Sequence, residues 1–253
     1  MSVPVRTLAL VLHTRRWSES SKIVELFTRQ RGNLKLMAKG ALRPKSPFAG
    51  VVESLNYVEV LFTVRETRSL QVLTSASLIN PFLHIRENWN KTAVAFAAAE
   101  LIAQALRQHE PVPAFFDYTI QWFTHLDRAG GQQFLDFLIH FLLELNRTLG
   151  FALNPEQCWA CHQPPRGKRI YLIYQNGAFL CQTCFRPGNF QGEWLNREAW
   201  QHLETVSRKS LAQLDEATHP ISPTELDIIR ALLQFLRFHV EFPIHIKSLT
   251  WLA

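Results

Sequence analysis

The sequence predicts an α+β fold in which a small β-barrel is followed by a helical domain that carries an inserted cysteine module. Three observations lead to this prediction. Short apolar runs separated by turns fill residues 1–80, apolar residues recur at helical spacing from about Asn88, and all four cysteines fall within 27 residues. We therefore expect one domain at 1–80 and a second at 81–253, with the cysteine module at about 154–188.

Five strands are expected in the first domain. They cover residues 7–12, 22–28, 34–39, 57–62 and 70–73. A loop punctuated by proline and glycine, residues 40–50, separates the third strand from the fourth. Five short strands in about 80 residues, with no helical pattern of any length, are typical of a small closed barrel such as an OB-fold.

The second domain is expected to be all-α apart from the cysteine module. Helices are expected from Asn88 to Pro111, from Ala114 to Arg128, from about Phe134 to Gly150, and from Asn196 to about Glu216. The last long helix opens with Ser222-Pro223-Thr224-Glu225, which is a capping box with proline at the first helical position, and it runs toward Pro243. The cysteines interrupt this helical part near its middle.

Positive charge is concentrated in the first domain. Residues 1–80 hold twelve Lys and Arg against five Glu, whereas the other 173 residues hold fifteen basic and sixteen acidic side chains. This asymmetry favours a polyanionic partner for the barrel; the alternative is a solvated basic face kept for solubility. The candidate DNA-binding residues are Arg15, Arg16, Lys22, Arg29, Arg31, Lys35, Lys39, Arg43 and Lys45. Trp17, Phe48 and Tyr57 could stack on bases, or they could belong to the core or cap of the barrel.

The four cysteines form two Cys-x2-Cys pairs separated by nineteen residues: Cys158, Cys161, Cys181 and Cys184. A two-residue spacer lets both thiolates of one turn face the same ion, and two such turns complete a tetrahedron, so the pattern predicts one structural zinc ion. Disulfides are the first alternative, and they do not suit a chain that we expect in the cytosol. A redox-active Cys-x2-Cys motif is the second alternative, but such a motif normally occurs as one pair beside a βαβ unit. His162 is a competing ligand, but four thiolates already fill a closed site.

No catalytic motif is found in the sequence. It contains no Gly-x-Gly-x-x-Gly or Walker loop, no His-Glu-x-x-His and no Gly-x-Ser-x-Gly. A tetrathiolate zinc site also leaves no open position for water. We therefore expect a protein that is not an enzyme. The absence of an apolar run of about 20 residues and of a signal segment predicts a cytoplasmic protein.

The N-terminal motifs resemble those of the bacterial recombination mediator RecO family. The matching residues are Leu10-Val11-Leu12, Arg15 or Arg16, Glu19-Ser20, Ile23-Val24, Leu26-Phe27-Thr28, Gly32 and Ala38-Lys39-Gly40-Ala41. The resemblance continues in Leu149-Gly150-Phe151 and in Ile246-Lys247-Ser248, so it covers essentially the whole chain. Two departures stand out. Leu42-Arg43-Pro44-Lys45 replaces adjacent basic residues, and Asn176-Gly177-Ala178 replaces a pair of glycines before the second cysteine pair.

The resemblance implies an OB-fold followed by helices, with a zinc module in many members. It implies a non-enzymatic, nucleoid-associated mediator of DNA repair and homologous recombination. Such a protein binds single- and double-stranded DNA, engages single-strand-binding protein and RecR, helps to load RecA, and anneals strands. Two alternatives come from other classes: an RNA-binding translation factor with OB-fold and zinc parts, and a zinc-stabilised adaptor that does not bind nucleic acid. A competition between DNA and RNA for binding distinguishes the translation factor from a DNA-binding protein. If the protein binds no nucleic acid at low salt, it is the adaptor.

Overall fold

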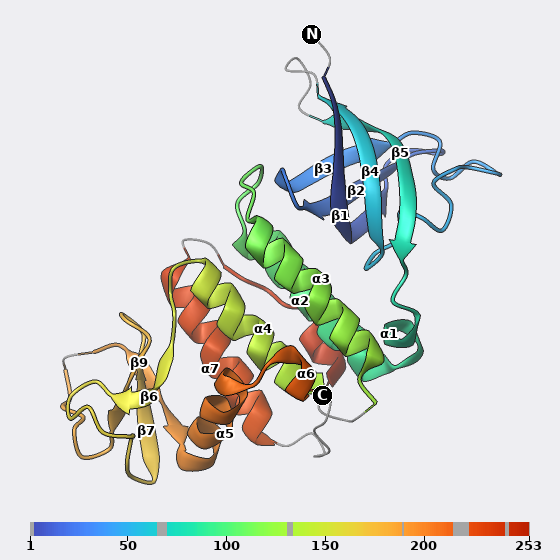
Figure 1. Ribbon diagram of the computed structural model, residues 1–253. Coiled ribbons are helices and arrows are strands. Elements are labelled where there is room, and N and C mark those ends of the chain that lie inside the picture. Colours follow the sequence, from blue (N-terminus) through green and yellow to red (C-terminus); the bar gives the residue numbers. More distant parts are fainter. Residues whose placement is uncertain are drawn as a thin grey trace. The chain divides into compact units, whose positions relative to one another are not determined.

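Two compact units make up the chain in the computed structural model, residues 1–127 with 245–253 and residues 128–244. The structure describes residues 3–64, 70–130, 134–188, 190–214, 223–240 and 243–252. Figure 1 shows the barrel strands of the first unit in blue to cyan, and the helices and small sheet of the second in yellow-green to red. Among the described residues, no helix is long and apolar enough to cross a membrane.

The first unit opens with a closed five-stranded barrel. Its strands are β1 (Val3–Arg16), β2 (Lys22–Thr28), β3 (Gly32–Ala38), β4 (Tyr57–Val64) and β5 (Gln71–Asn80). They follow one another around the barrel in the order β1-β2-β3-β5-β4, and β4 pairs with β1 to close it. All pairs are antiparallel except β3 with β5. The predicted OB-fold is thereby confirmed.

Alternation along the strands builds the barrel core. In β4, for example, Val58, Val60 and Phe62 point inward and are buried, while the residues between them are partly exposed. The loop between β3 and β4 adds Phe48 and Val52 to the same core. Burial of these side chains holds the barrel closed without a helix inside it.

Two strands are longer than the apolar pattern predicts. β1 extends to Val3 and Arg16, and β5 extends to Asn80 instead of ending at residue 73. Much of β5 after Leu73 faces solvent, so its side chains do not alternate between apolar and polar. Backbone pairing with β4, which includes two register shifts, holds this part in the sheet.

Helices complete the first unit. They are α1 (Leu83–Glu87), α2 (Trp89–Ala105), α3 (Pro113–Arg128) and the 3-10 helix η1 (Ser248–Leu252). Phe27 of the barrel packs against Phe115 and Phe116 of α3, with ring centroids 6.1 and 5.3 Å apart. The buried amide of Asn33 on β3 donates to the backbone oxygen of Ile102 on α2, at 2.8 Å. Apolar packing and a buried hydrogen bond therefore fix both helices to the barrel.

The second unit combines helices with a four-stranded sheet. Its elements are α4 (Phe134–Thr148), β6 (Asn154–Cys158), β7 (Arg169–Ile173), β8 (Ala178–Cys181), β9 (Gly192–Asn196), α5 (Arg197–Arg208), α6 (Leu211–Leu214) and α7 (Pro223–His239). The sheet order is β6-β8-β7-β9, and β7 with β8 forms an antiparallel hairpin between the cysteine pairs. Gly177 in its turn has φ +66°, and a Cβ there would lie 2.5 Å from the backbone oxygen of Ala152. Glycine is therefore required at this turn.

Some expected features fall at other places or outside the described residues. The helix expected at 196–216 is divided into α5 and α6, and its expected end, Glu216, lies outside the described residues, as does the capping residue Ser222. Strands give way to helices after Asn80, which is the expected domain boundary, but the compact units divide at 127 and 128. The division at residue 80 stays a prediction about which parts fold independently.

Candidate nucleic-acid surface and metal site

A shallow hollow lies at one end of the barrel, where the turn after β1 meets the loop after β3. It is lined by Trp17, Ser18, Ser20, Ser21, Met37, Lys39, Gly40 and Arg43. The amide of Trp17 donates to the backbone oxygen of Ser21, and that of Leu42 donates to Ser20, both at 2.9 Å. These backbone bonds tie the two segments together, so the side chains around the hollow project from a fixed frame.

Six of the nine candidate DNA-binding residues belong to the segments that meet at this end, which are the end of β1, the start of β2 and the loop after β3. We call them the basic rim: Arg15, Arg16, Lys22, Lys39, Arg43 and Lys45. Strand register explains the grouping, because Arg16 is paired with Lys22 and Lys22 with Ala38, the residue before Lys39. Lys22 is largely buried and forms an ion pair with Glu53 at 2.8 Å. In the described part of the chain, the other five are exposed and form no ion pair with a carboxylate.

The other three candidates lie elsewhere on the barrel. Arg29 forms two hydrogen bonds of 2.8 Å with the carboxylate of Asp117 on α3. These bonds hold the pKa of Asp117 below its usual value and raise that of Arg29. Arg31 and Lys35 line a separate pocket, and Lys35 lies 3.4 Å from Glu25. Arg29 is thus engaged in joining α3 to the barrel. Arg65 and Arg68, which add to the charge of this domain, lie outside the described residues.

Trp17 is the aromatic side chain best placed for stacking among the three considered. Trp17 is 53% exposed, and the guanidinium carbon of Arg15 lies 5.6 Å from the centroid of the Trp17 ring. Phe48 is buried in the barrel core, and half-buried Tyr57 contacts Phe116 with centroids 6.4 Å apart. The core interpretation therefore fits Phe48 and Tyr57, whereas Trp17 offers an open ring beside cations.

The four cysteine sulfurs in the second unit converge. The Sγ atoms of Cys158, Cys161, Cys181 and Cys184 all lie within 4.8 Å of one another. Cys161 and Cys181 are 3.8 Å apart, far longer than the ~2.05 Å of a disulfide. A tetrahedron with Zn–S bonds of ~2.3 Å has edges of about 3.8 Å. The four side chains could therefore hold a metal ion, and their spacing fits zinc.

Backbone geometry supports this cluster. The amide of His162 donates to the oxygen of Cys158 at 2.8 Å, and that of Cys184 donates to Cys181 at 3.0 Å, which closes one turn at each pair. Two further amides point at sulfur: Arg166 at Cys181, at 3.1 Å, and Cys181 at Cys158, at 3.3 Å. Such N–H···S bonds favour thiolates. His162 is exposed and is not part of the converging set.

The pKa values of two of the thiols are shifted in opposite directions. Burial raises the pKa of Cys181 to about 12. Burial acts in the same direction on Cys158, but backbone N–H groups outweigh it and lower the pKa of that thiol to about 7. Four thiolates cannot coexist in so small a volume without a cation, so a metal ion is what would let all four ionise.

A second group of ionisable side chains was not expected from the sequence. Asp136 on α4, His202 on α5 and Glu225 on α7 bring their polar atoms within 4.8 Å of one another. The Nε2 atom of His202 lies 2.5 Å from Asp136, and the ammonium of Lys209 lies 3.9 Å from the other oxygen of that carboxylate. The short N···O contact is that of a charge-assisted hydrogen bond, so we interpret the group as a buried ion-pair network. An acid among apolar residues, Phe134-Leu135-Asp136-Phe137, was the available signal.

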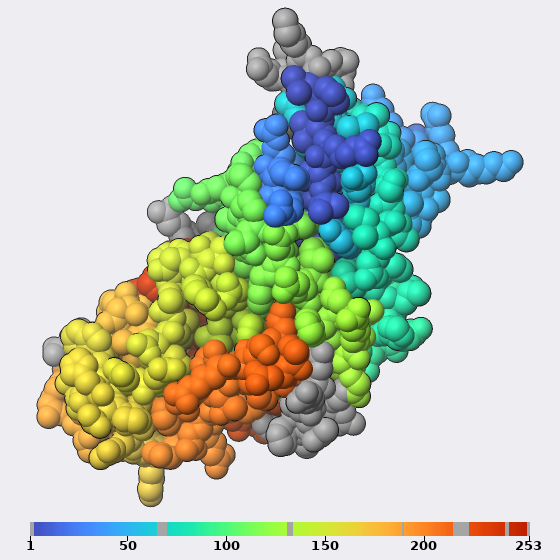
Figure 2. All heavy atoms as spheres, in the orientation of Figure 1, coloured from blue at the N-terminus to red at the C-terminus, as the bar shows by residue number. Residues whose placement is uncertain are grey.

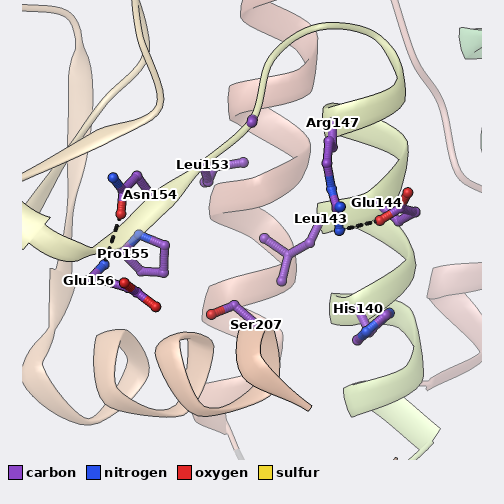
Figure 3. A pocket seen from close by; sticks show the side chains of 10 residues that line it. His140, Leu143, Glu144, Arg147, Leu153, Asn154, Pro155, Glu156 and Ser207 are labelled. Atoms are coloured by element: carbon purple, nitrogen blue, oxygen red, sulfur yellow. Dashed lines mark hydrogen bonds and ion pairs between the residues drawn. The ribbon is translucent and has the colours of Figure 1, made fainter. Parts of the chain in front are cut away.

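A pocket of about 240 Å³ lies beside α4 in the same unit. Figure 3 shows His140, Leu143, Glu144 and Arg147 reaching it from α4, opposite Asn154, Pro155, Glu156 and Ser207. His140 is bonded to the backbone oxygen of Lys209 at 3.1 Å and Ser207 to that of Glu204 at 2.7 Å. The imidazole and the hydroxyl therefore each have a backbone carbonyl as a hydrogen-bond partner.

Together these features define a class: an OB-fold protein with an exposed basic rim, extended by a helical unit that carries a module whose four cysteines could hold a metal ion. The family model described as "Recombination protein O N terminal" matches residues 1–82, and "Recombination protein O C terminal" matches residues 86–249. The chain therefore belongs to the RecO family of DNA repair proteins, as its motifs predicted.

Relatives with curated names support the same family assignment along most of the chain. A protein named "DNA repair protein RecO" from Chloroherpeton thalassium is 26% identical over 245 residues, which cover 93% of each chain. One of the same name from Clostridium kluyveri is 25% identical and covers 91% of this chain and 95% of its own. Another, from Exiguobacterium sibiricum, is 33% identical over 68% of this chain and 67% of its own.

Proposed function

We propose that this protein is a non-enzymatic mediator of homologous recombination that binds single- and double-stranded DNA through the basic rim. Its protein partners would be single-strand-binding protein and RecR, and it would promote the loading of RecA onto DNA. We also expect it to anneal complementary strands. One observation carries the DNA-binding part. Lys39 and Arg43 line a hollow together with the exposed Trp17, and within the described residues none of the five exposed rim cations has a carboxylate partner. The RecO family membership supports the rest, with a place of action in the cytoplasm, at the nucleoid.

The rim has the properties that binding to DNA without sequence preference requires. Lysine and arginine side chains neutralise phosphates and release condensed counterions, an attraction that does not depend on base sequence. The indole of Trp17 adds a surface on which any base can stack. Cations already paired with Glu53 or Asp117 contribute less, since a phosphate would have to displace a carboxylate.

We also propose that the cysteine cluster holds one structural zinc ion. The zinc would fix the two cysteine turns and the β7–β8 hairpin as one module, and its closed sulfur shell leaves no position for a substrate. The proposal rests on the mutual distances of the four Sγ atoms. One zinc per chain in the purified protein is the expected metal content.

Charge reversal at the rim tests the proposal. The triple variant Lys39→Glu, Arg43→Glu, Lys45→Glu removes three attractions and adds three repulsions. We expect it to weaken binding to a fluorescent single strand at least tenfold, or about 1.4 kcal/mol. Its thermal midpoint should change little, because exposed charge changes usually cost within ~0.5 kcal/mol each. Fluorescence anisotropy titrations of the intact protein measure the effect.

The matched control reverses three exposed arginines of the second unit, Arg147, Arg208 and Arg230, each of which lies beside a carboxylate. Lys209 is unsuitable as a control because it lies near the buried Asp136. Equal weakening by both triples would contradict the rim as the DNA site. Preference for RNA over DNA in direct competition would indicate the translation-factor alternative, and no binding at low salt would indicate the adaptor.

A further inference from the structure

The cysteine module has a charge distribution that the net charge of residues 81–253 conceals. Residues 157–192 contain four basic side chains and no Asp or Glu, while the remainder of 81–253 holds eleven basic and sixteen acidic side chains. The four are Arg166, Lys168, Arg169 and Arg186, and all are exposed. In this segment of 36 residues every charged side chain of Lys, Arg, Asp or Glu type is positive, whereas the surrounding region is acidic. Such a distribution favours binding of a polyanion.

We propose that this module is a second contact surface for single-stranded DNA, with Trp159 as a stacking platform and the four exposed cations of the module as phosphate contacts. The inference rests on the proposed DNA-binding function and adds a surface to it. We call this surface the module face: Trp159, Arg166, Lys168, Arg169 and Arg186. Figure 2 shows the module in yellow to light orange, with much of it open to solvent.

The four cations are free to meet phosphate. Within the described residues, none of them forms an ion pair with a carboxylate, in contrast to Arg147, Arg208 and Arg230 of the same unit. Arg169 lies over the ring of Trp194, with its guanidinium carbon 5.3 Å from the centroid. Arg186 donates to the backbone oxygens of Thr183 and Phe185 at 2.9 Å. Each of these contacts positions a guanidinium without neutralising it.

The backbone beneath the cations is held in place. The amide of Arg166 donates to the sulfur of Cys181, and the amide of Lys168 donates to the side chain of Gln182, both at 3.1 Å. Both side chains therefore project from a turn that is bonded to the second cysteine pair. A metal ion on the cysteines would stiffen this support further.

Trp159 lies inside the first cysteine turn, between Cys158 and Cys161, and is 51% exposed. Its amide is bonded to the backbone oxygen of Phe179 at 2.8 Å, and its ring meets that of Phe190 edge-on, with centroids 5.4 Å apart. This T-shaped contact steadies the indole, which stays half exposed. Trp194, by contrast, packs against Tyr171 and Phe185 and belongs to the module's core. Only the first of these two tryptophans is presented as a base would need it.

A single strand fits this surface better than a duplex, because its bases are free to stack on Trp159 while its phosphates meet the cations. The rival explanation is that the cations stabilise the double negative charge of a zinc ion with four thiolates. The two explanations predict different losses. Removing cations lowers DNA affinity if they meet phosphate, and it lowers zinc affinity if they serve the metal.

Two variants of the intact, zinc-loaded protein test the proposal with a fluorescent oligothymidine. Arg166→Gln with Lys168→Gln should reduce the slope of log affinity against log salt by about 1.4, since each phosphate contact on a single strand contributes ~0.7. Trp159→Ala should weaken binding about fivefold or more. The matched control, Arg147→Gln with Arg230→Gln, should change neither quantity. Zinc content and thermal midpoint are measured on every variant.

Photo-crosslinking gives a readout that a merely structural role would not change. A strand carrying 5-iodouracil should crosslink to Trp159, with the adduct mapped by mass spectrometry. This inference would be overturned by the absence of an adduct together with unchanged affinity in both variants. If rim reversal still weakens binding at least tenfold, the proposed function stays intact. Loss of zinc without loss of DNA affinity would also overturn it. If the wild-type protein binds no DNA, the proposed function fails as well.

Discussion

Asp136 is fully buried on α4, and its hydrogen bond to His202 determines how that histidine titrates. The hydrogen bond that His202 donates to the carboxylate of Asp136 raises the pKa of His202 above its ordinary value, and burial opposes this to a lesser degree. His140 behaves in the opposite way, because burial lowers its pKa. The two histidines therefore make opposite contributions to the pH dependence of stability.

The sign follows from linkage. A histidine with a raised pKa stabilises the folded state fully below its unfolded value of about 6.5, and this stabilisation is lost as pH rises through the folded pKa. We expect His202→Gln to be destabilising at pH 6 relative to the wild type, with the difference shrinking toward pH 8. His140→Gln should show no such loss at high pH. Urea unfolding of both variants at several pH values measures this, and a pH-independent deficit for His202→Gln would contradict it.

At the scale of elements, the turn from β2 to β3 depends on one glycine. Gly32 has φ +61°, and a Cβ there would collide with the backbone oxygen of Glu110. The neighbouring residue Asn33 accepts a hydrogen bond from the amide of His109 at 2.9 Å. Two segments of backbone therefore meet at a position where only glycine fits.

Gly32→Ala should destabilise the protein by about 2 kcal/mol or more, because it adds a backbone clash to the ~1–2 kcal/mol cost of a left-handed conformation. Gly50→Ala is the matched control, since Gly50 has φ +72° and no atom within 4 Å of the added Cβ. Its cost should be limited to the conformational part. Equal unfolding midpoints for the two variants in urea would show that the close approach to Glu110 does not matter.

The cysteine turns are a second set of elements whose stability depends on one interaction. Cys158→Ser removes a ligand, and apparent zinc binding energies of ~10–16 kcal/mol in small modules show how much folding depends on such a metal. We expect loss of zinc and local unfolding of the module. Metal analysis and proteolysis measure both, with Ser207→Ala as a control. Full zinc retention in Cys158→Ser, or no zinc in the wild type, would contradict a four-cysteine zinc site.

Elements with strong periodicity could be predicted from the sequence, and those held by partners could not. The alternation in β4 and the helical spacing in α4 both follow directly from which side chains are buried. The later half of β5 has no such alternation, because its side chains face solvent and its place is fixed by β4. For the same reason β6 and β9 went unpredicted: each is a short strand held by pairing with the β7–β8 hairpin.

The cysteine cluster was predictable because its spacing carries the geometry, and the rim was predictable only in part. Composition gives the number of cations but not their partners. In the sequence, nothing distinguishes Lys22 and Arg29 from the other basic residues. In the structure, Lys22 pairs with Glu53, 31 residues away, and Arg29 pairs with Asp117, 88 residues away. The Asp136–His202 pair joins positions 66 residues apart. No local pattern reports such a distant pairing.

For the whole molecule, the central claim is that exposed cations at the end of the barrel bind DNA by neutralising phosphates. Single-strand affinity measured over a range of salt concentrations tests it most directly. With about five rim contacts, log affinity should fall against log salt with a slope of −3 or steeper, and neutralising Lys39, Arg43 and Lys45 to Gln should reduce that slope by about 2. A flat salt response, or the same slope in the wild type and the neutralised variant, would contradict the account.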